Sequence, residues 1–253
     1  MRDLKISLIT VCYNAGHTIE RSIRSVLAQS YKNIEFIVID GSSTDNTMEI
    51  IHKYRHKLDF FLTEPDKGIY DAMNKGIKMA TGDIIGMLNA DDYLADTTIL
   101  AEIADQFAGN GARIVYGDLD YVNSEGAVVR KWRSGKYKHG LFNWGWMPPH
   151  PAFYCKKELF DRFGFYSLEY GTAGDYEFML RLMHKNQIDA CYLEKVMVKM
   201  TVGGESNKSL SNRMKGLWFD LKAMRNNGIK YPLWTLFLKP ARKISQFFTW
   251  KNH

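Results

Sequence analysis

The amino-acid sequence predicts an α/β protein with a mostly parallel central sheet covered by helices on both faces, and three observations support this class. Through the first 110 residues, apolar strand-like runs alternate with segments of helical periodicity. The runs are apolar at nearly every position, as in strands that are buried on both faces. Polar, glycine-rich and acidic segments follow them, and ligands bind beyond the carboxyl ends of parallel strands.

Four strand–helix units account for the first half of the chain. The strands are expected in KISLITVCY, IEFIVID, KLDFFLTE and DIIGMLN. The helices are expected in HTIERSIRSVLAQSY, TDNTMEIIHKYRH, GIYDAMNKGIKMATG and DTTILAEIADQFAG. In the first helix Ile19, Ile23 and Val26 recur at helical spacing, and Thr44 or Asp45 can cap the second.

After residue 110 the pattern changes. ARIVYGDLDYV and AVVRKW predict a hairpin closed by NSEG, and the aromatic, proline-rich loop NWGWMPPHPAFYC leads into a short strand. AGDYEFMLRLMHKN predicts a helix and IDACYLEKVMVKM a strand, before the loop TVGGESNKS. We therefore expect one body over residues 1–205, with a nucleotide-binding half at about 1–110 and an acceptor half at about 111–205. A helical tail is expected over 206–253.

Size and cysteine content point to an intracellular protein with a full core. The chain has 253 residues, of which 45% are hydrophobic, enough for one large domain. Cys12, Cys155 and Cys191 are odd in number and far apart, which argues against a disulfide framework and a zinc site. No apolar run has the length of a signal-peptide core or a membrane span. We expect a cytoplasmic protein.

The positive charge is concentrated in the tail. Of the net +6, the segment from Asn207 onward contributes seven Lys and three Arg against one acid, Asp220. A slightly acidic body does not fit a domain wrapped in nucleic acid, so no nucleic-acid partner is expected. The tail mixes these cations with bulky aromatics, which is typical of a segment lying in a membrane interface. A helix packed on the body, with its charges solvated, is the alternative.

Two adjacent carboxylates, Asp91 and Asp92, follow the apolar strand IIGMLN. Like charges at a strand end make sense when a cation lies between or beside them. Mg²⁺ and Mn²⁺ take oxygen ligands, commonly one or two carboxylates together with substrate phosphates. The alternative is structural: Asp92 caps the helix that begins near residue 96, and Asp91 is a solvated turn residue.

The loops after the first two strands offer groups for a nucleoside. Asp40 ends the apolar run IEFIVID and precedes Gly-Ser-Ser, so it could accept a proton from a nucleobase imide N–H. An Asx turn is the alternative. Tyr13 offers a stacking face and Asn14 a polar contact, although a tyrosine at such a position is more often part of a core.

Four segments, in this order and spacing, resemble the glycosyltransferase family 2 pattern: ISLITVCYNAGHTIERSIRSVLAQSY, EFIVIDGSSTDNT, DKGIYDAMNKGIKMATGDIIGMLNADDY and GDYEFMLRL. The resemblance covers roughly residues 5–200. It implies the GT-A fold, a Rossmann-like three-layer sandwich with the helical tail appended, and an inverting, metal-dependent transfer from a nucleotide-diphosphate sugar.

The resemblance also implies roles for individual residues. The nucleoside, expected to be uridine, would contact Thr10, Tyr13, Asn14 and Asp40, whereas Lys67, Asp71 and Asn74 would line the ribose, diphosphate or sugar. Asn89-Ala90-Asp91 stands where the family usually has Asp-x-Asp, with Asp91 as the ligand of Mn²⁺ or Mg²⁺. The asparagine at position 89 is a departure that removes one negative charge.

Asp175 in AGDYEF occupies the position of the catalytic base. The family pattern is often Glu-Asp, so Gly174 is a second departure, while the acid itself is kept. A carboxylate in the first turn of a helix is stabilised by the dipole and can take the proton of an acceptor hydroxyl. Glu177 is the alternative base, and helix capping is the structural alternative for Asp175.

Two residues of the proline-rich loop are candidates for the acceptor side. His150 lies between prolines where such enzymes receive the acceptor, or it is purely structural. Trp146, like Trp144, could stack on a sugar or close the core.

The predicted function is therefore an inverting glycosyltransferase that uses a UDP-sugar and a saccharide acceptor, expected to be lipid-linked, in bacterial surface-polysaccharide synthesis. Attachment to the inner face of the membrane would follow from the tail. A dehydrogenase is disfavoured because CYNAGHT lacks G-x-G-x-x-G, and a nucleotidyltransferase because no Gly- and Arg-rich loop follows the first strand. The rival from another class is a non-catalytic, membrane-associated sugar-nucleotide-binding or scaffolding member of the same fold.

Overall fold

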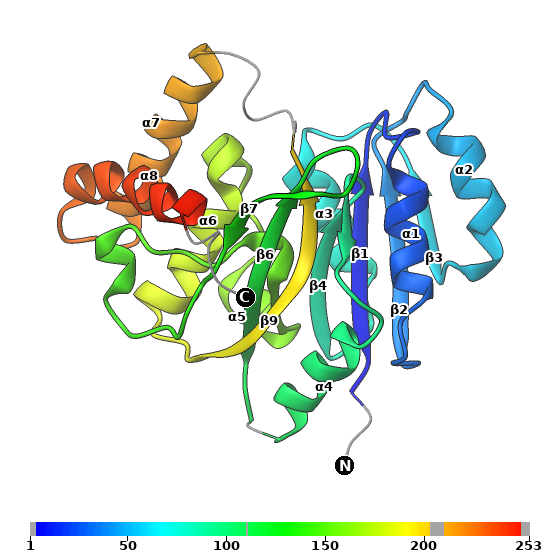
Figure 1. Cartoon of the computed structure of the whole chain (residues 1–253), viewed down its shortest axis with the longest axis horizontal. Coiled ribbons are helices and arrows are strands. Elements are labelled where there is room, and N and C mark those ends of the chain that lie inside the picture. Colours follow the sequence, from blue (N-terminus) through cyan, green and yellow to red (C-terminus); the bar gives the residue numbers. More distant parts are fainter. Residues whose placement is uncertain (1–3, 110, 203–209, 249–253) are drawn as a thin grey trace.

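A curved central sheet organises the molecule (Figure 1). The structure is a computed structural model, and it describes residues 4–109, 111–202 and 210–248. In this part of the chain the sheet has nine strands, in the order β3-β2-β1-β4-β8-β6-β9-β5, with β7 paired to β6. Helices cover both of its faces, which is the layered α/β architecture predicted from the sequence.

The first half is the expected series of strand–helix units. The strands β1 (Ile6–Cys12), β2 (Ile34–Asp40), β3 (Phe60–Thr63) and β4 (Ile84–Asn89) are parallel to one another. The helices are α1 (Ile19–Leu27), α2 (Thr47–Tyr54, continued by the 3-10 turn Arg55–Lys57), α3 (Ile69–Met79) and α4 (Ile99–Gly109). Because Cys12 pairs with Asp40 and Val11 with Asn89, the carboxyl ends of these strands lie at one edge.

The second half makes the sheet mixed. Its strands are β5 (Asp92–Leu94), β6 (Ile114–Val122), β7 (Val128–Trp132), β8 (Phe153–Lys156) and β9 (Ala190–Thr201). β8 is antiparallel to β4 and β6, whereas β9 is parallel to β6. β6 and β7 form the predicted hairpin. β5 was not predicted: it follows β4 directly and pairs with β9, so α4 starts only at Ile99.

The helices of the second half are short and partly irregular. They comprise the 3-10 turns η2 (Leu141–Trp144), η3 (His150–Ala152) and η4 (Leu168–Ala173), and α5 (Glu158–Phe163). The helix predicted over AGDYEFMLRLMHKN is α6 (Gly174–Met179), which continues as a π-helix over Leu180–Lys185.

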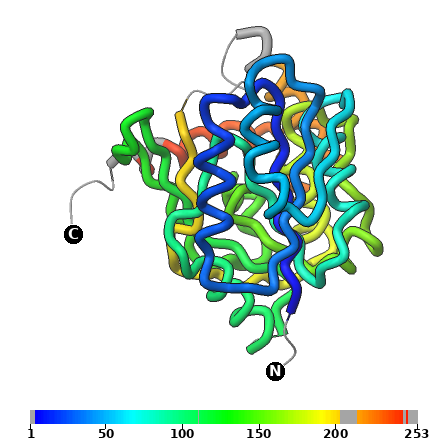
Figure 2. The backbone as a smooth tube through the Cα atoms, turned by 90° about the vertical axis from the view of Figure 1, so that its right-hand side faces the viewer, coloured from blue at the N-terminus to red at the C-terminus, as the bar shows by residue number. Residues whose placement is uncertain are grey.

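Two apolar cores lie on opposite faces of the sheet because side chains alternate along each strand. On β1, Ile9 packs into the core shared with α3, α5 and α6, while Leu8 packs into the core shared with α1, α2 and α4. Figure 2 shows α1 and α2 side by side in the layer over one face. This double burial explains why the strands are apolar at consecutive positions.

A buried carboxylate ties the amino ends of the strands together, away from the loops that follow them. Glu35 on β2 accepts hydrogen bonds from Ser7 Oγ (2.5 Å), Thr81 N (2.7 Å) and Lys5 Nζ (3.0 Å). Burial opposes its charge, but these donors outweigh the burial and lower the pKa of Glu35 to about 2.

The tail forms two helices, α7 (Leu210–Asn226) and α8 (Pro232–Phe248), and both pack on the body. Thr235 is buried and its Oγ1 donates to Asn143 O (2.7 Å). Gly145, at φ 74°, lies so close that a Cβ there would be 2.5 Å from Lys239 N. Within the described residues no helix combines the length and apolarity needed to cross a bilayer. The predicted boundary at residues 205–206 falls outside the described residues.

Candidate active site

The loops after β1, β2 and β3 meet at the upper edge of the sheet in Figure 1. A Cβ on Gly41 would collide with the Asp66 carboxylate and would lie 3.5 Å from the Tyr13 ring. The glycine therefore lets the three loops approach each other. Tyr13 is 64% exposed, so its ring is a free face at this edge and does not belong to the core.

Besides Tyr13, three nucleoside contacts are predicted, and two of them form hydrogen bonds within the loops themselves. Asp40 is fully buried and accepts hydrogen bonds from Ser43 N (3.0 Å), Ser43 Oγ (2.5 Å) and Thr63 Oγ1 (2.7 Å). Asn14, at φ 47°, accepts from Thr44 N (2.8 Å). Asp40 thus shapes the loop after β2 through the residue three positions on, and its contact with a base stays a prediction.

Thr10 is the third of these residues. It is buried on β1, and its Oγ1 has no hydrogen-bond partner among the described residues.

Lys67, Asp71 and Asn74, predicted to line the ribose, diphosphate or sugar, differ in exposure and in hydrogen-bond partners. Lys67 is exposed, and its backbone N–H donates to Asp71 Oδ2 (3.0 Å). Asp71 also lies 3.8 Å from Lys75 Nζ. Asn74 exchanges two hydrogen bonds with the Tyr166 backbone, at 2.8 and 3.0 Å. The Asn74 amide therefore joins α3 to the segment before η4, whereas Lys67 is exposed in the loop before α3 and Asp71 is half-buried in the first turn of that helix.

The backbone of Asp91 is held between β4 and β5. Its carbonyl oxygen accepts from Thr201 Oγ1 (2.7 Å) and from Arg21 Nη2 (3.3 Å), while Ala90 before it is buried. Burial raises the pKa of the Asp91 carboxyl, although His150 and Arg21 favour its charged form. The strand tip therefore presents a partly desolvated carboxylate whose position is fixed.

Asp92 is not a helix cap. It belongs to β5 and is fully buried, and burial together with the charge of Asp91 raises its pKa well above the usual value. The turn before α4 is closed by Asp96, whose Oδ1 accepts from Thr98 N (2.8 Å). Beside Asp91, the oxygens Asp92 Oδ1 and Asn89 Oδ1 are buried and have no hydrogen-bond partner among the described residues.

A chain of polar contacts connects this strand tip to α6. Asn89 Nδ2 lies 3.2 Å from His150 Nε2, and His150 Nδ1 lies 3.4 Å from Asp175 Oδ2. Tyr70 Oη donates to Asp175 Oδ1 (2.9 Å). Because an amide NH₂ can only donate, Nε2 of His150 accepts, and the imidazole proton on Nδ1 faces Asp175. The structure thus brings Asn89, Asp91, His150 and Asp175 together from segments far apart in the sequence.

The surroundings of Asp175 explain the glycine before it. A Cβ on Gly174 would lie 2.8 Å from the Tyr70 ring. Tyr70 is buried, and burial, reinforced by Asp175, raises its pKa well above the usual value, so the phenol is a neutral donor. Glu177 points elsewhere: it is buried and pairs with Arg181 (2.9 and 3.1 Å), which leaves Asp175 as the acid facing His150.

For Trp146 the structure favours the second of its two expected roles, closing the core. Its indole is 4% exposed and packs against Tyr116, Tyr137 and Phe142, while Nε1 donates to Ser134 O (2.7 Å). Its faces are covered by aromatic neighbours, so stacking on a sugar does not fit. Trp144, two residues earlier, is 59% exposed.

Several site residues gave no signal in the sequence. Tyr70 lies within GIYDAMNKG, where the sequence predicts only a helix and nothing marks the tyrosine as a site residue. Arg21 and Thr201, which fix Asp91, lie on α1 and at the end of β9. Asp66 is identified only because the structure places its carboxylate next to Gly41. Sequence spacing alone could not identify these partners.

A metal at this edge would need ligands from the substrate. In the described part of the chain, no three His, Cys, Asp or Glu side chains converge closely enough to hold a metal ion. Asp91 and the unpartnered oxygens next to it offer a partial set of hard oxygen donors. Such a set fits a divalent cation that completes its shell with diphosphate oxygens and water.

Comparison with known proteins supports a sugar-transfer role. The model of the family described as Glycosyl transferase family 2 matches residues 7–168, more than half of the chain. An uncharacterized glycosyltransferase of Mycobacterium tuberculosis is 32% identical over 188 residues, which span 70% of this chain and 68% of the relative. A PGL/p-HBAD biosynthesis glycosyltransferase of Mycobacterium bovis is 28% identical over 79% of this chain and 78% of its own.

A third relative and two solved structures extend the comparison. The Escherichia coli UDP-Glc:alpha-D-GlcNAc-diphosphoundecaprenol beta-1,3-glucosyltransferase WfgD is 33% identical over 51% of each chain. S. aureus TarS 1-349 in complex with UDP superimposes with a TM-score of 0.68 at 20% identity, over 99% of this chain and 76% of TarS. The mannosyltransferase PcManGT of Pyrobaculum calidifontis, solved with GDP-Man and Mn²⁺, gives 0.67 at 16% identity over the same shares. These two likenesses show the fold.

Proposed function

The chain belongs to glycosyltransferase family 2, and from this premise we propose that it transfers a sugar, with inversion, from a nucleoside-diphosphate donor to a saccharide acceptor. The observation that carries the proposal is the placement of Asp91 at a strand tip and Asp175 at a helix start, joined through Asn89 and His150. Asp91 can hold the cation that accompanies the departing diphosphate, and Asp175 can take the proton of the attacking hydroxyl. We further propose a UDP-sugar as the donor and bacterial surface polysaccharide or glycolipid assembly as the setting.

The donor would lie over the loops after β1 to β3. The exposed Tyr13 ring is available to stack on the base, with Thr10, Asn14 and Asp40 behind it, and Lys67 and Asp71 would face the ribose and diphosphate. TarS, which shares the fold, was solved with UDP and with UDP-GlcNAc, and this supports the proposal of a UDP-sugar donor. Asn74 supports the wall of this site through Tyr166.

Asp91 would hold the Mn²⁺ or Mg²⁺ ion that accompanies the diphosphate. Among the described residues the buried Asp91 carboxyl has no ion pair and the nearby oxygens of Asn89 and Asp92 have no hydrogen-bond partner, which fits a divalent cation at this place. When bound, such a metal neutralises the charge that develops on the departing diphosphate. Arg21 and Thr201 keep the strand tip in position for it.

Asp175 would act as the base. The acceptor oxygen attacks the anomeric carbon, the bond from that carbon to the diphosphate oxygen breaks, and the hydroxyl proton passes to the Asp175 carboxylate. Tyr70 at Oδ1 and His150 at Oδ2 fix the plane of the carboxylate and leave its other lone pairs for the acceptor. His150 is therefore a positioning residue.

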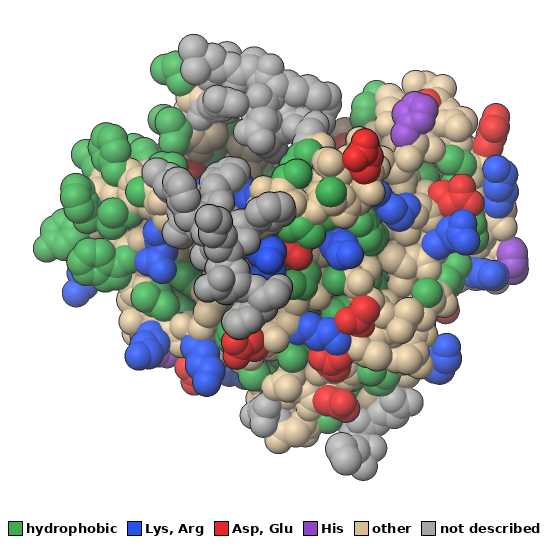
Figure 3. Space-filling model, in the orientation of Figure 1, with side chains coloured by type: hydrophobic (Ala, Val, Ile, Leu, Met, Phe, Trp, Pro, Cys, Tyr) green, Lys and Arg blue, Asp and Glu red, His purple; other side chains and the backbone are tan. Residues whose placement is uncertain are grey.

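The acceptor side would face a membrane. Large apolar side chains are exposed on α7, on α8 and in the turn between them (Leu217, Trp218, Tyr231, Leu233, Trp234 and Phe237). Figure 3 shows hydrophobic side chains gathered at the left of the molecule, where these helices lie. Exposed patches of this kind mark interaction surfaces. WfgD, by its name, acts on a diphosphoundecaprenol-linked sugar. We propose peripheral attachment to the membrane and a lipid-linked acceptor.

A donor screen tests the function. The protein is incubated with UDP-, GDP- and dTDP-sugars in Mn²⁺ or Mg²⁺, and the released nucleoside diphosphate is measured. We expect release from one class of UDP-sugar, lost in EDTA and in Asp91→Ala. Binding of UDP without hydrolysis or transfer, across all donors and with lipid extracts added, would favour the non-catalytic alternative.

A further inference from the structure

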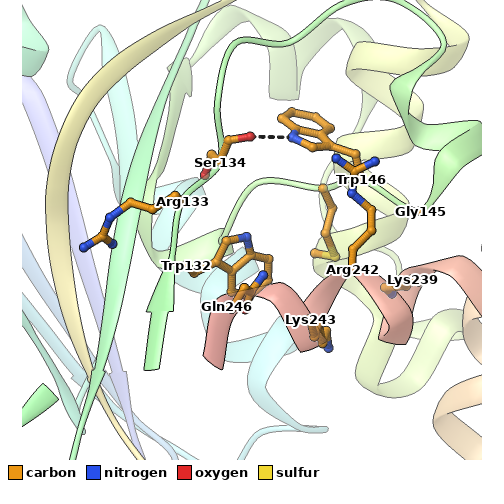
Figure 4. A pocket seen from close by; sticks show the side chains of 10 residues that line it. Trp132, Arg133, Ser134, Gly145, Trp146, Lys239, Arg242, Lys243 and Gln246 are labelled. Atoms are coloured by element: carbon orange, nitrogen blue, oxygen red, sulfur yellow. Dashed lines mark hydrogen bonds between the residues drawn. The ribbon is translucent and has the colours of Figure 1, made fainter. Parts of the chain in front are cut away.

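Helix α8 turns apolar side chains outward and basic side chains toward the body, which is the reverse of the usual orientation of a surface helix. Leu233, Trp234 and Phe237 on its first two turns face outward, with Phe237 75% exposed. Its cations Lys239 and Lys243 are partly buried against the body, with 11% of the Lys239 side chain exposed. Positions 239, 242, 243 and 246 share one helical face, and that face lines a cavity, shown close up in Figure 4.

The cavity lies between α8, β7 and the segment around Gly145. Its volume is about 90 Å³, enough for roughly three water molecules or one phosphate group. Arg133, Trp146, Lys239, Arg242, Lys243 and Gln246 are among its walls, and none of the described residues that line it is acidic. It is therefore a small, basic cavity with an aromatic wall.

Two of the four cations that line the cavity have anionic partners among the described residues. The Arg133 side chain points away from the cavity in Figure 4 and pairs with Asp118 (3.6 Å) and Asp120 (2.7 Å). Lys239 pairs with Asp220 (2.8 Å). Lys243, in contrast, makes no hydrogen bond or ion pair with the described residues, and burial, Lys239 and Arg130 lower its pKa. A half-buried cation without a partner is unfavourable unless an anion joins it.

One wall of the cavity contacts the helix that carries the proposed base. The Lys239 ammonium lies 3.6 Å from the centre of the Tyr176 ring, and Tyr176 follows Asp175 on α6. Lys243 itself lies within electrostatic range of Asp175. Asp91, where the donor diphosphate is proposed, lies at the strand tip between β4 and β5. The cavity is thus formed by different elements from those proposed to hold the donor.

We propose that this cavity binds a phosphoryl group of the acceptor, with Lys243 and Arg242 as its cationic contacts. The inference rests on the proposed function and names the acceptor class as a phosphate- or diphosphate-linked saccharide. The anion would neutralise Lys243, while the outward aromatic turns of α8 lie against the lipid. One helix would then hold both ends of an amphiphilic acceptor, and the sugar would extend toward Asp175.

Binding without turnover tests the proposal on the full chain. Inorganic pyrophosphate and farnesyl diphosphate are titrated by calorimetry in EDTA, so that no metal can hold them at Asp91. Lys243→Met and the double variant Lys243→Gln/Arg242→Gln are compared with Lys136→Gln, an exposed lysine outside the cavity. UDP with Mn²⁺ is titrated separately, and vesicles of phosphatidylcholine with one-fifth phosphatidylglycerol form a third arm.

We expect the cavity variants to bind both diphosphates at least tenfold more weakly, with UDP–Mn²⁺ affinity changed less than threefold and the control unchanged. Farnesol should bind at least tenfold more weakly than farnesyl diphosphate. Lys243→Met should have a Tm equal to or above that of the wild type, because it removes an unpaired charge, but pyrophosphate should no longer raise it. Unchanged pyrophosphate affinity overturns the proposal, as does a loss confined to vesicles or to UDP–Mn²⁺. Failure of UDP to bind at all overturns the donor site instead.

Discussion

Replacing Asp175 by asparagine removes the proposed base while preserving its shape. The carboxamide oxygen can still accept from Tyr70 Oη, now 2.9 Å from Asp175 Oδ1, and the amide nitrogen would face His150. The substitution replaces one partly buried hydrogen-bond acceptor, the oxygen that faces His150, by an NH₂ donor. The free energy of unfolding should therefore fall by no more than about 1 kcal/mol. In a chain of this length that lowers Tm by about 2–4 °C.

The effect on catalysis should be far larger. Loss of a general base costs about 10²- to 10⁴-fold in rate, or roughly 3–5 kcal/mol in the activation barrier. We expect kcat for UDP release with acceptor present to fall at least about a hundredfold. The dissociation constant for UDP with Mn²⁺ should stay within about threefold, because Asp175 lies across the site from the strand tip.

Glu177→Gln is the matched control, because it changes an acid to its amide on the same helix. Glu177 pairs with Arg181, whose guanidinium also donates to Phe163 O and to Phe165 O (2.8 Å). Breaking this buried pair should cost about 3–5 kcal/mol of stability, while kcat per folded molecule stays within about threefold. The opposite pattern, with activity kept in Asp175→Asn and lost in Glu177→Gln, would make Glu177 the base and refute the assignment.

Three further outcomes are expected. Asp91→Ala should abolish the Mn²⁺-dependent part of UDP binding in calorimetry. The control Asp105→Ala, on an exposed turn of α4, should leave that binding intact. Equal affinity of the wild type for UDP with and without Mn²⁺ contradicts the metal site. Glu35→Gln should lower the free energy of unfolding in urea by about 3 kcal/mol at pH 7. That loss should shrink by about 2 kcal/mol at pH 3, because a pKa lowered to about 2 stabilises the fold above pH 4.5 and does so less as pH falls toward 2. Trp234→Ser/Phe237→Ser should reduce sedimentation with anionic vesicles at least about fivefold, on the scale of the apolar area lost, and unchanged sedimentation excludes these residues from a membrane surface.

The first half of the fold could be predicted because its strands are buried on both faces and its helices on one. These two constraints leave periodicities that a sequence shows directly. β5 could not be predicted, because three residues carry no periodicity and its partner β9 lies about a hundred positions further along the chain. Because Asp92 belongs to β5, however, it is buried in the sheet and does not cap α4. The sequence alone left Asp92 open between a metal ligand and a helix cap.

The local sequence also does not show which of two neighbouring tryptophans is buried. Trp144 and Trp146 are two residues apart in an aromatic loop, and nothing in their spacing separates them. Gly145 between them adopts φ 74°, which turns the chain so that one indole is exposed and the other enters the core. The turn is also where α8 makes its closest approach, so its geometry depends on a helix nearly a hundred residues away.

The two departures from the family pattern have physical reasons that only the structure supplies. Gly174 makes room for the Tyr70 ring, which then donates to Asp175. Asn89 gives an N–H group to both Asp92 Oδ2 (3.3 Å) and His150 Nε2 (3.2 Å). A carboxylate at position 89 would instead place a third negative charge beside Asp91 and Asp92, and it would favour a proton on the Nε2 atom of His150. With the Asn89 amide donating to Nε2, the Nδ1 atom of His150 faces Asp175, so the residue that removes a charge from the metal side also orients the proposed base.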